Sequence, residues 1–263
     1  MALREKPAAK TAKRTASPTR VLYLYAISQM PRTAAPQISS ESIDGFSPVE
    51  AVRCGKYLAW ISRVSKTEFA DHLTESMQDL EWLATAGLRH QRAVAEISGV
   101  LTALPARFGT VFLTEESLAK HIDERSKTLQ QAFEQIADAD EWGIKIFATP
   151  KAASRAATKA SSGSEYLKRK AELLQPRTSG KLDDEVAELV SALTALAVAA
   201  SPGGKASAGQ PGLVWHGSFL IRRKDRKKLE TALKKYAGSW TDKRRIDCSG
   251  PWPPYSFVGD NVH

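Results

Sequence analysis

Two groups of neighbouring carboxylates have residue types and a spacing that could do chemistry. Asp138, Asp140 and Glu141 form the first group, and Asp-Asp-Glu at 183–185 forms the second. Paired carboxylates can serve as a general acid and a general base. Both groups stand where the pattern predicts a loop or the first turn of a helix, and such positions favour negative charge for structural reasons. We therefore assign them no catalytic role.

Other motifs for enzymatic chemistry fail on spacing. A phosphate-binding loop that ended at Gly204-Lys205 would need glycine at position 199 and serine or threonine at position 206, but both positions are alanine. The chain has no GxSxG, no HExxH and no GxGxxG after a predicted strand. The sequence therefore predicts no enzyme activity, no catalytic residue and no cofactor.

Cysteine and histidine are too scattered to suggest a metal centre. Cys54 and Cys248 form no CxxC motif, so we expect neither a disulfide framework nor a zinc module. This cysteine content is typical of a protein from a reducing compartment. His72 and His90 fall in helical regions without a second ligand four residues later. We interpret each as a hydrogen-bonded core or boundary residue, with a ligand or catalytic role as the alternative.

Basic residues bear on the choice of binding partner. The net charge is +9, and the first twenty residues hold six Lys or Arg against one Glu. A second cluster at 222–228 reads RRKDRKK. Such patches favour acidic partners, although a solvated face is the commoner explanation. A nucleic-acid-binding protein is the alternative function, although no RNP, helix-turn-helix or zinc-finger pattern supports it.

The residues best suited to binding stand near the C-terminus, where positions 250–258 read GPWPPYSFV. The prolines fix φ and remove backbone donors, so we expect a rigid approach to a short strand that begins after Pro254. Two interpretations stay open: the rings plug the chain's own core, or they form a docking edge for another protein. The candidate interaction residues are Trp252, Pro253, Pro254, Tyr255 and Phe257.

A second unusual triplet follows Pro105. Arg107, Phe108 and Gly109 bring together a guanidinium, a ring and a residue that is free to adopt positive φ. We expect a structural role, in which Arg107 pairs with a carboxylate inside the fold. Pairing with an acidic group of a partner is the alternative.

Apolar patterning predicts the elements that position these residues. Continuous or alternating apolar residues predict strands at 21–27, 57–65, 142–148 and 213–221. Spacings of three and four predict helices from Ser65 to about 84, at 88–97, from Thr114 to 136, from 164 to 198 with a break at Pro176, and at 224–236.

The order of these elements predicts two α+β domains. After a disordered basic extension at 1–19, we expect an N-terminal domain of mixed sheet and helices at 20–113. The C-terminal domain spans 114–263, with flexible segments near 149–163 and 201–212. From residue 144 the order is strand, long helix, strand, helix, strand, which is close to a ferredoxin-like layout. The chain has no apolar run of about eighteen residues and no secretory signal, so we expect a soluble cytoplasmic protein.

The chain resembles the gas vesicle protein F/L family over roughly residues 20 to 258. The ending GPWPPYSFV is the most specific part, and it is joined by ARFGTV at 106–111, the helix from Trp82 to His90, GSEYL at 163–167 and LYLY at 22–25. The basic extension, the insertion near residue 155 and Pro176 depart from the family's pattern.

This resemblance implies two α+β domains, of which the second is a modified ferredoxin-like fold. It also implies a non-catalytic accessory or minor structural protein of gas vesicle assembly, located on the gas vesicle or in the cytoplasm. The implied partners are the small hydrophobic shell protein and other accessory gas vesicle proteins.

Overall fold

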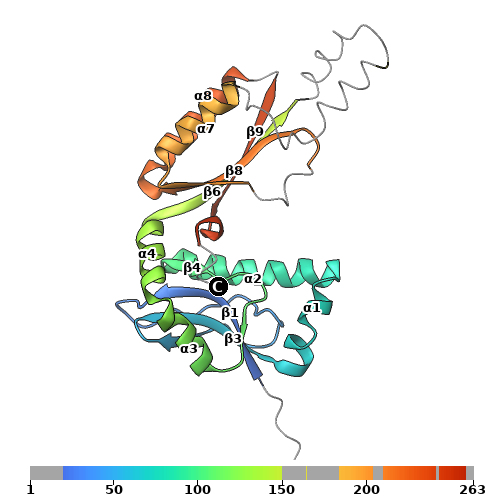
Figure 1. Cartoon of the computed structure of the whole chain (residues 1–263), viewed down its shortest axis with the longest axis vertical. Helices are drawn as coiled ribbons and strands as arrows, with labels where there is room; N and C mark the ends of the chain where they lie inside the picture. The colour runs from blue at the N-terminus through green and yellow to red at the C-terminus, as the bar shows by residue number, and fades with distance from the viewer. Residues whose placement is uncertain (1–19, 150–163, 165–183, 204–209, 241–242, 259–263) are drawn as a thin grey trace, which may run out of the picture.

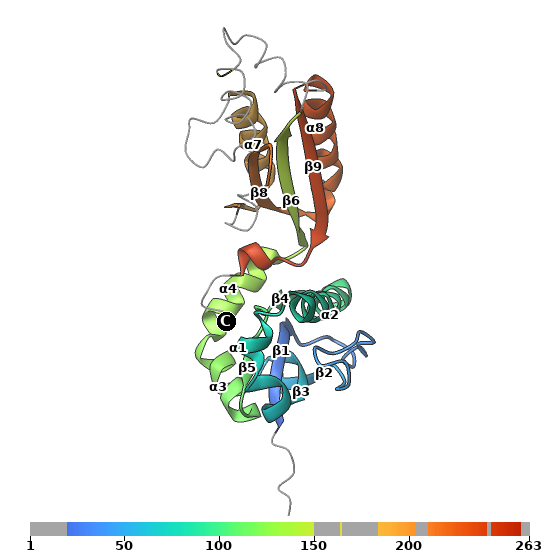
Figure 2. The same ribbon diagram turned by 90° about the vertical axis from the view of Figure 1, so that its right-hand side faces the viewer.

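Two antiparallel sheets, each with its own helices, follow one another along the long axis of the molecule (Figures 1 and 2). This computed structural model describes residues 20–149, 164, 184–203, 210–240 and 243–258. The basic extension, the helix expected between 165 and 183, and most of the segments expected to be flexible near 149–163 and 201–212 lie outside the described residues.

The first sheet is organised around its central strand β1. Its strands are β1 (Arg20–Gln29), β2 (Glu50–Cys54), β3 (Tyr57–Ser65), β4 (Ala103–Pro105) and β5 (Val111–Phe112). The order is β2-β3-β1-β4, and β5 also pairs with β1. The continuous apolar runs at 21–27 and 57–65 therefore do form strands, as predicted. Pro105 ends the edge strand β4, where a missing backbone N–H is tolerated.

Both faces of this sheet are covered by helices. On one face Tyr23 and Tyr25 pack with Val94 and Ile97 of α2 (Leu80–Val100). On the other face Leu22 and Leu24 pack with α3 (Glu115–Glu124) and α4 (Ser126–Ile136). Alternate side chains of a strand point to opposite faces, which explains why β1 is apolar at nearly every position.

Two helices predicted as continuous are interrupted. Ser65 accepts a hydrogen bond from the Glu68 N–H as the expected N-cap, but the element it begins is a five-residue π-helical turn, Lys66–Ala70. After α1 (Leu73–Ser76), Asp79 caps a new helix, so the helix predicted at 88–97 is the interior of α2. The helix predicted at 114–136 breaks at Arg125 into α3 and α4. At Asp79 a short polar side chain that caps free N–H groups restarts the helix, whereas at Arg125 no side chain caps the start of α4.

The second sheet has the ferredoxin-like order β7-β8-β6-β9. Its elements are β6 (Ala139–Ala148), α7 (Asp184–Leu196), β7 (Ala199–Pro202), β8 (Leu213–Arg222), α8 (Arg226–Ser239) and β9 (Arg244–Trp252). Both helices lie on one face of the sheet (Figure 2), where Ile144 and Ile146 pack with Leu189 and Leu229. The expected layout is confirmed, with β7 as an additional strand that overlaps the start of the region expected to be flexible.

The helices α3 and α4 belong with the first sheet rather than with the second. Six of their residues are buried in the core that also contains Leu22 and Leu24: Leu118, Ile122, Leu129, Ala132, Phe133 and Ile136. A boundary after residue 113 would separate these helices from the sheet on which they pack. We therefore propose a domain boundary between Ile136 and Ala139.

This boundary predicts how fragments behave. A fragment of residues 20–138 should show cooperative thermal unfolding by circular dichroism, because it retains the helices that cover one face of β1. A fragment of residues 20–113 should aggregate or unfold without a transition, because Leu22, Leu24 and Ile27 lose that cover. Cooperative folding of the shorter fragment would contradict the revised boundary.

Candidate functional site

The C-terminal segment, residues 250–258, leads from the second sheet back to the first domain (Figure 1). The edge strand β9 ends at Trp252, and residues Tyr255–Phe257 form a single 3-10 turn. The order is therefore the reverse of the prediction, in which a strand begins after Pro254. An edge strand tolerates Pro251 because one of its sides needs no backbone donor.

A buried carboxylate anchors this segment to the second sheet. Glu141 of β6 is only 6% exposed. Its two oxygens accept hydrogen bonds from the Ser256 N–H at 2.8 Å and from the Ser256 hydroxyl at 2.6 Å. A buried charge is tolerated when such donors satisfy it. The interpretation of Glu141 as a loop charge is therefore wrong, because it lies in a strand and holds the C-terminal segment.

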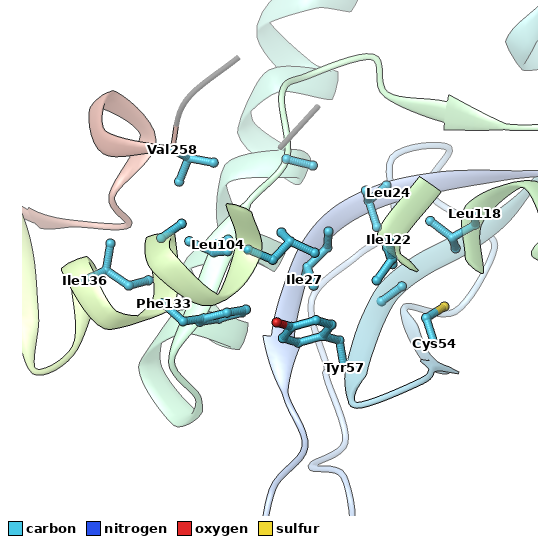
Figure 3. Close-up of a cluster of buried hydrophobic side chains, with 14 of the residues drawn as sticks. Leu24, Ile27, Cys54, Tyr57, Leu104, Leu118, Ile122, Phe133, Ile136 and Val258 are labelled. Carbon is cyan, nitrogen blue, oxygen red and sulfur yellow. The ribbon is translucent and has the colours of Figure 1, made fainter. Parts of the chain in front are cut away.

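Apolar packing anchors the same segment to the first domain. Val258 is 5% exposed and belongs to the core cluster that contains Leu104 and Ile136, with Phe257 packed against it (Figure 3). At the start of the segment Gly250 has φ +131°, and a Cβ there would lie 2.8 Å from the Glu141 carbonyl oxygen. The geometry thus supports a core role for Phe257 and Val258.

Two rings of the segment remain partly exposed between these anchors. Trp252 is 41% and Tyr255 is 36% exposed, whereas Pro253 and Pro254 are buried. Burial of the Tyr255 hydroxyl, reinforced by the charge of Glu141, raises its pKa. The hydroxyl end therefore faces inward, while another part of the ring faces solvent.

A cleft of about 340 Å³ lies beside Trp252. It is lined by residues 251–254, by the end of α2 with Ala95 and Ser98, and by Asp140 and Arg223. Trp252 therefore gives the cleft a partly exposed aromatic wall. The two charged residues that line the cleft are paired with each other at 3.2 Å.

The triplet 107–109 lies at a turn beside an aromatic cluster. Phe108 packs 5.7 Å from His90 between ring centroids, and the Gly109 N–H donates to the Tyr23 hydroxyl at 3.2 Å. Gly109 adopts the expected positive φ, 86°. Arg107 is exposed, and its carbonyl accepts hydrogen bonds from Thr110. The pairing of Arg107 with a carboxylate stays a prediction.

His90 is a hydrogen-bonded core residue. It is 4% exposed, and its Nδ1 lies 2.9 Å from the Tyr23 hydroxyl. Burial lowers its pKa to about 4, with a backbone contact to Ala106 acting in the opposite direction. His72, by contrast, is exposed and lies 3.3 Å from Glu75. Within the described ranges, no three His, Cys, Asp or Glu side chains are grouped to hold a metal ion.

The basic cluster at 222–228 is partly neutralised. Arg223 pairs with Asp140 at 3.2 Å, Arg226 with Glu230 at 2.9 Å and Lys228 with Asp225 at 2.8 Å. These pairs lie at the surface, as the commoner explanation of a solvated face requires. They reduce the charge that the nucleic-acid alternative needs.

A protein-family model matches most of the chain. The model described as "Gas vesicle synthesis protein GvpL/GvpF" matches residues 21–259. The chain belongs to the GvpL/GvpF family. It therefore has a role related to gas vesicles.

Individual relatives agree with this family. The chain is 27% identical to "Gas vesicle protein L" of Streptomyces sp. (strain CB03234), with 94% of this chain and 97% of the relative covered. Crystal structures of the gas vesicle protein GvpF show the same fold. For Anabaena sp. PCC7120 the TM-score is 0.68 at 17% identity, with 91% of this chain and 96% of that chain covered. For Microcystis aeruginosa the TM-score is 0.64 at 19% identity, with 91% and 99% covered.

Among the residues that the structure describes, no helix is both long enough and apolar enough to cross a bilayer.

The buried His90 makes the stability of this GvpL/GvpF chain depend on pH. Its pKa is about 4 when folded and about 6.5 when unfolded, so the unfolded state binds more protons between these values. Stability is therefore full above pH 6.5 and is lost as the pH falls toward 4. Between pH 6.5 and 5 the free energy of unfolding in urea should drop by about 2 kcal/mol.

Two variants isolate this effect. His90→Gln should flatten the drop, while His72→Gln should keep it, because His72 is exposed. The lowered pKa values of Asp44 and Glu96 act at lower pH. Burial also lowers the pKa of His216, so His216 contributes in the same window and part of the drop should remain in His90→Gln. An equal slope in His90→Gln and the unmodified protein would contradict the assignment.

Proposed function

We propose that this GvpL/GvpF chain is a non-catalytic accessory or minor structural protein of gas vesicle assembly. It binds the small hydrophobic shell protein and other accessory gas vesicle proteins, on the vesicle or in the cytoplasm. The observation that carries the proposal is the pair of partly exposed rings, Trp252 and Tyr255, on a segment anchored at both ends.

The anchoring supports binding because it orders the rings before a partner arrives. Ser256 is tied to Glu141, and Val258 is held in a core. Prolines on both sides of Trp252 restrict the backbone further. A pre-ordered aromatic pair loses little conformational entropy on docking, so much of the free energy of ring burial contributes to affinity.

The second sheet offers a further contact surface. Its helices cover one face, and β7 and β9 form its two edges (Figure 2). An uncovered edge can pair with a strand of another protein through backbone hydrogen bonds. Trp252 is the last residue of β9, so a strand added there would lie next to the cleft.

The cleft itself favours binding over catalysis. Its two charged groups, Asp140 and Arg223, neutralise each other. The remaining lining residues are Ala, Gly, Pro, Leu, Ile and Trp, with hydroxyl groups from Ser98 and Thr102, and no histidine or cysteine is among the described residues that line the cleft. This lining suits an apolar partner surface.

A pull-down with the purified shell protein tests the proposal. The double variant Trp252→Ala plus Tyr255→Ala should lose at least tenfold in affinity, because buried aromatic anchors often contribute 2 kcal/mol or more. Phe46→Ala is the matched control, since Phe46 is 93% exposed on a loop of the first domain; it should bind like the unmodified protein. Unchanged binding by a folded double variant would remove the assignment.

A further inference from the structure

The outer edge of β9 is unpaired among the described residues. β9 is the last strand of the order β7-β8-β6-β9, so only its inner side forms a ladder (Figure 2). It has nine residues, whereas the opposite edge strand β7 has four and ends at Pro202. An uncovered edge is a template for another strand. β9 is therefore the longer of the two open edges of this sheet.

The pairing with β6 shows which backbone groups of β9 point outward. The Thr149 N–H donates to the Lys243 carbonyl at 3.1 Å, and this pair continues the β6–β9 register. Hydrogen-bonded pairs alternate along an antiparallel ladder, so the odd-numbered residues of β9 bond to β6. The even-numbered residues of the regular part of the strand face outward, and they are Arg244, Ile246 and Cys248.

These outward groups are complementary to themselves. The Arg244 N–H already donates to the Trp240 carbonyl at 3.0 Å, which leaves the N–H groups of Ile246 and Cys248 as outward donors. When two copies of β9 run antiparallel about a two-fold axis at Ile246, each Ile246 N–H meets the Ile246 carbonyl of the other copy. Each Cys248 N–H then meets the Arg244 carbonyl of the other copy, so both outward donors are used.

Side-chain charge selects this register. Ile246 packs against the core beneath the helices, so its neighbours Arg245 and Asp247 lie on the other face of the sheet. They pair with each other at 2.9 Å, and the Arg245 guanidinium lies 4.8 Å from the centre of the Phe147 ring. Both side chains are therefore held in place at the edge, and both are exposed.

Only one position of the axis brings opposite charges together. With the axis at Ile246, Arg245 of each copy lies directly opposite Asp247 of the other. An axis at Arg245 would place two arginines opposite each other, and an axis at Asp247 would place two aspartates there. Like charges directly opposite each other destabilise a strand pair, and opposite charges stabilise it.

We infer that two copies of this chain associate through antiparallel β9 strands, with the two-fold axis at Ile246, and so join their second sheets into one continuous sheet. Such an isologous contact closes with two subunits. The charge pattern favours a second copy over a strand of another protein at this edge. The paired segment ends at Cys248, before Trp252 and Tyr255 begin, so the dimer leaves the proposed docking rings free.

Light scattering after size exclusion of the full chain tests the dimer. At high concentration the unmodified protein should run at twice its 28.7 kDa mass, and it should dissociate on dilution. Cys248→Pro should be monomeric, because proline removes an outward N–H without removing a bond to β6. Cys248→Ser keeps that N–H and is the matched control. A monomer of the unmodified protein at every concentration up to about 100 μM would overturn the inference.

Charge exchange tests the register and does not depend on the proline variant. Arg245→Asp and Asp247→Arg should each weaken the dimer several-fold, because like charges then lie opposite each other. An equimolar mixture of the two should recover it, because every Arg again faces an Asp. The pair within one chain is broken in both variants, so recovery reports a contact between copies. Arg53→Asp, exposed on the edge strand β2, is the control. Failure of the mixture to recover would exclude this register.

Disulfide formation tests the position of the axis. In a Cys248→Ser background, Arg245→Cys mixed with Asp247→Cys should give a covalent dimer on mild oxidation. The two residues form a non-hydrogen-bonded cross-strand pair, whose Cα atoms lie about 4.5 Å apart, and Cys54 is buried. Neither variant alone should cross-link to the same extent. Equal cross-linking in the mixture and in the single variants would contradict the geometry.

Shell-protein binding separates this inference from the proposed function. Arg245→Asp should bind the shell protein as the unmodified protein does, because Trp252 and Tyr255 are unchanged. Loss of that binding in Arg245→Asp, together with a monomeric unmodified protein, would assign the edge to a strand of the shell protein and overturn the dimer.

Discussion

The arrangement of the two domains depends on one buried interaction, in which the Glu141 carboxylate receives the N–H and the hydroxyl of Ser256. Glu141 lies near the start of β6, just after the chain leaves the first domain. Ser256 lies near the end of the described chain. The interaction therefore closes a loop that contains the whole second domain. With Val258 in the first core, the two domains are joined twice, by the α4–β6 connection and by the returning C-terminal segment.

This double connection explains how one short segment serves two purposes. Phe257 and Val258 face the core, whereas Trp252 and Tyr255 keep part of their surface in solvent. The two interpretations of the aromatic ending thus apply to different rings. Phe257 and Val258 contribute to stability, and the proposed docking uses Trp252 and Tyr255. A flexible tail with the same rings would lose more entropy on binding.

The sequence predicts those elements whose cause is local. The unbroken apolar run of β1 indicates a strand covered on both faces, and α3, α4 and α2 supply that cover. β7 is not predictable in the same way, because Ala-Ala-Ser-Pro has no strand pattern and is held by pairing with β8. The break at Asp79 depends on a side-chain cap, whereas the break at Arg125 has no side-chain cap. The role of Glu141 is also hidden, because its partner lies 115 residues away.

Hydrogen exchange at the Ser256 amide tests whether the C-terminal segment is held in the folded protein. Because this N–H is donated to a buried carboxylate, it should exchange as slowly as the backbone amides of β6. That result would show that the C-terminal segment is part of the folded unit in the free protein. Exchange at the rate of an unstructured peptide, with β6 still protected, would contradict the central claim that the anchored segment joins the domains and presents its rings in a fixed position.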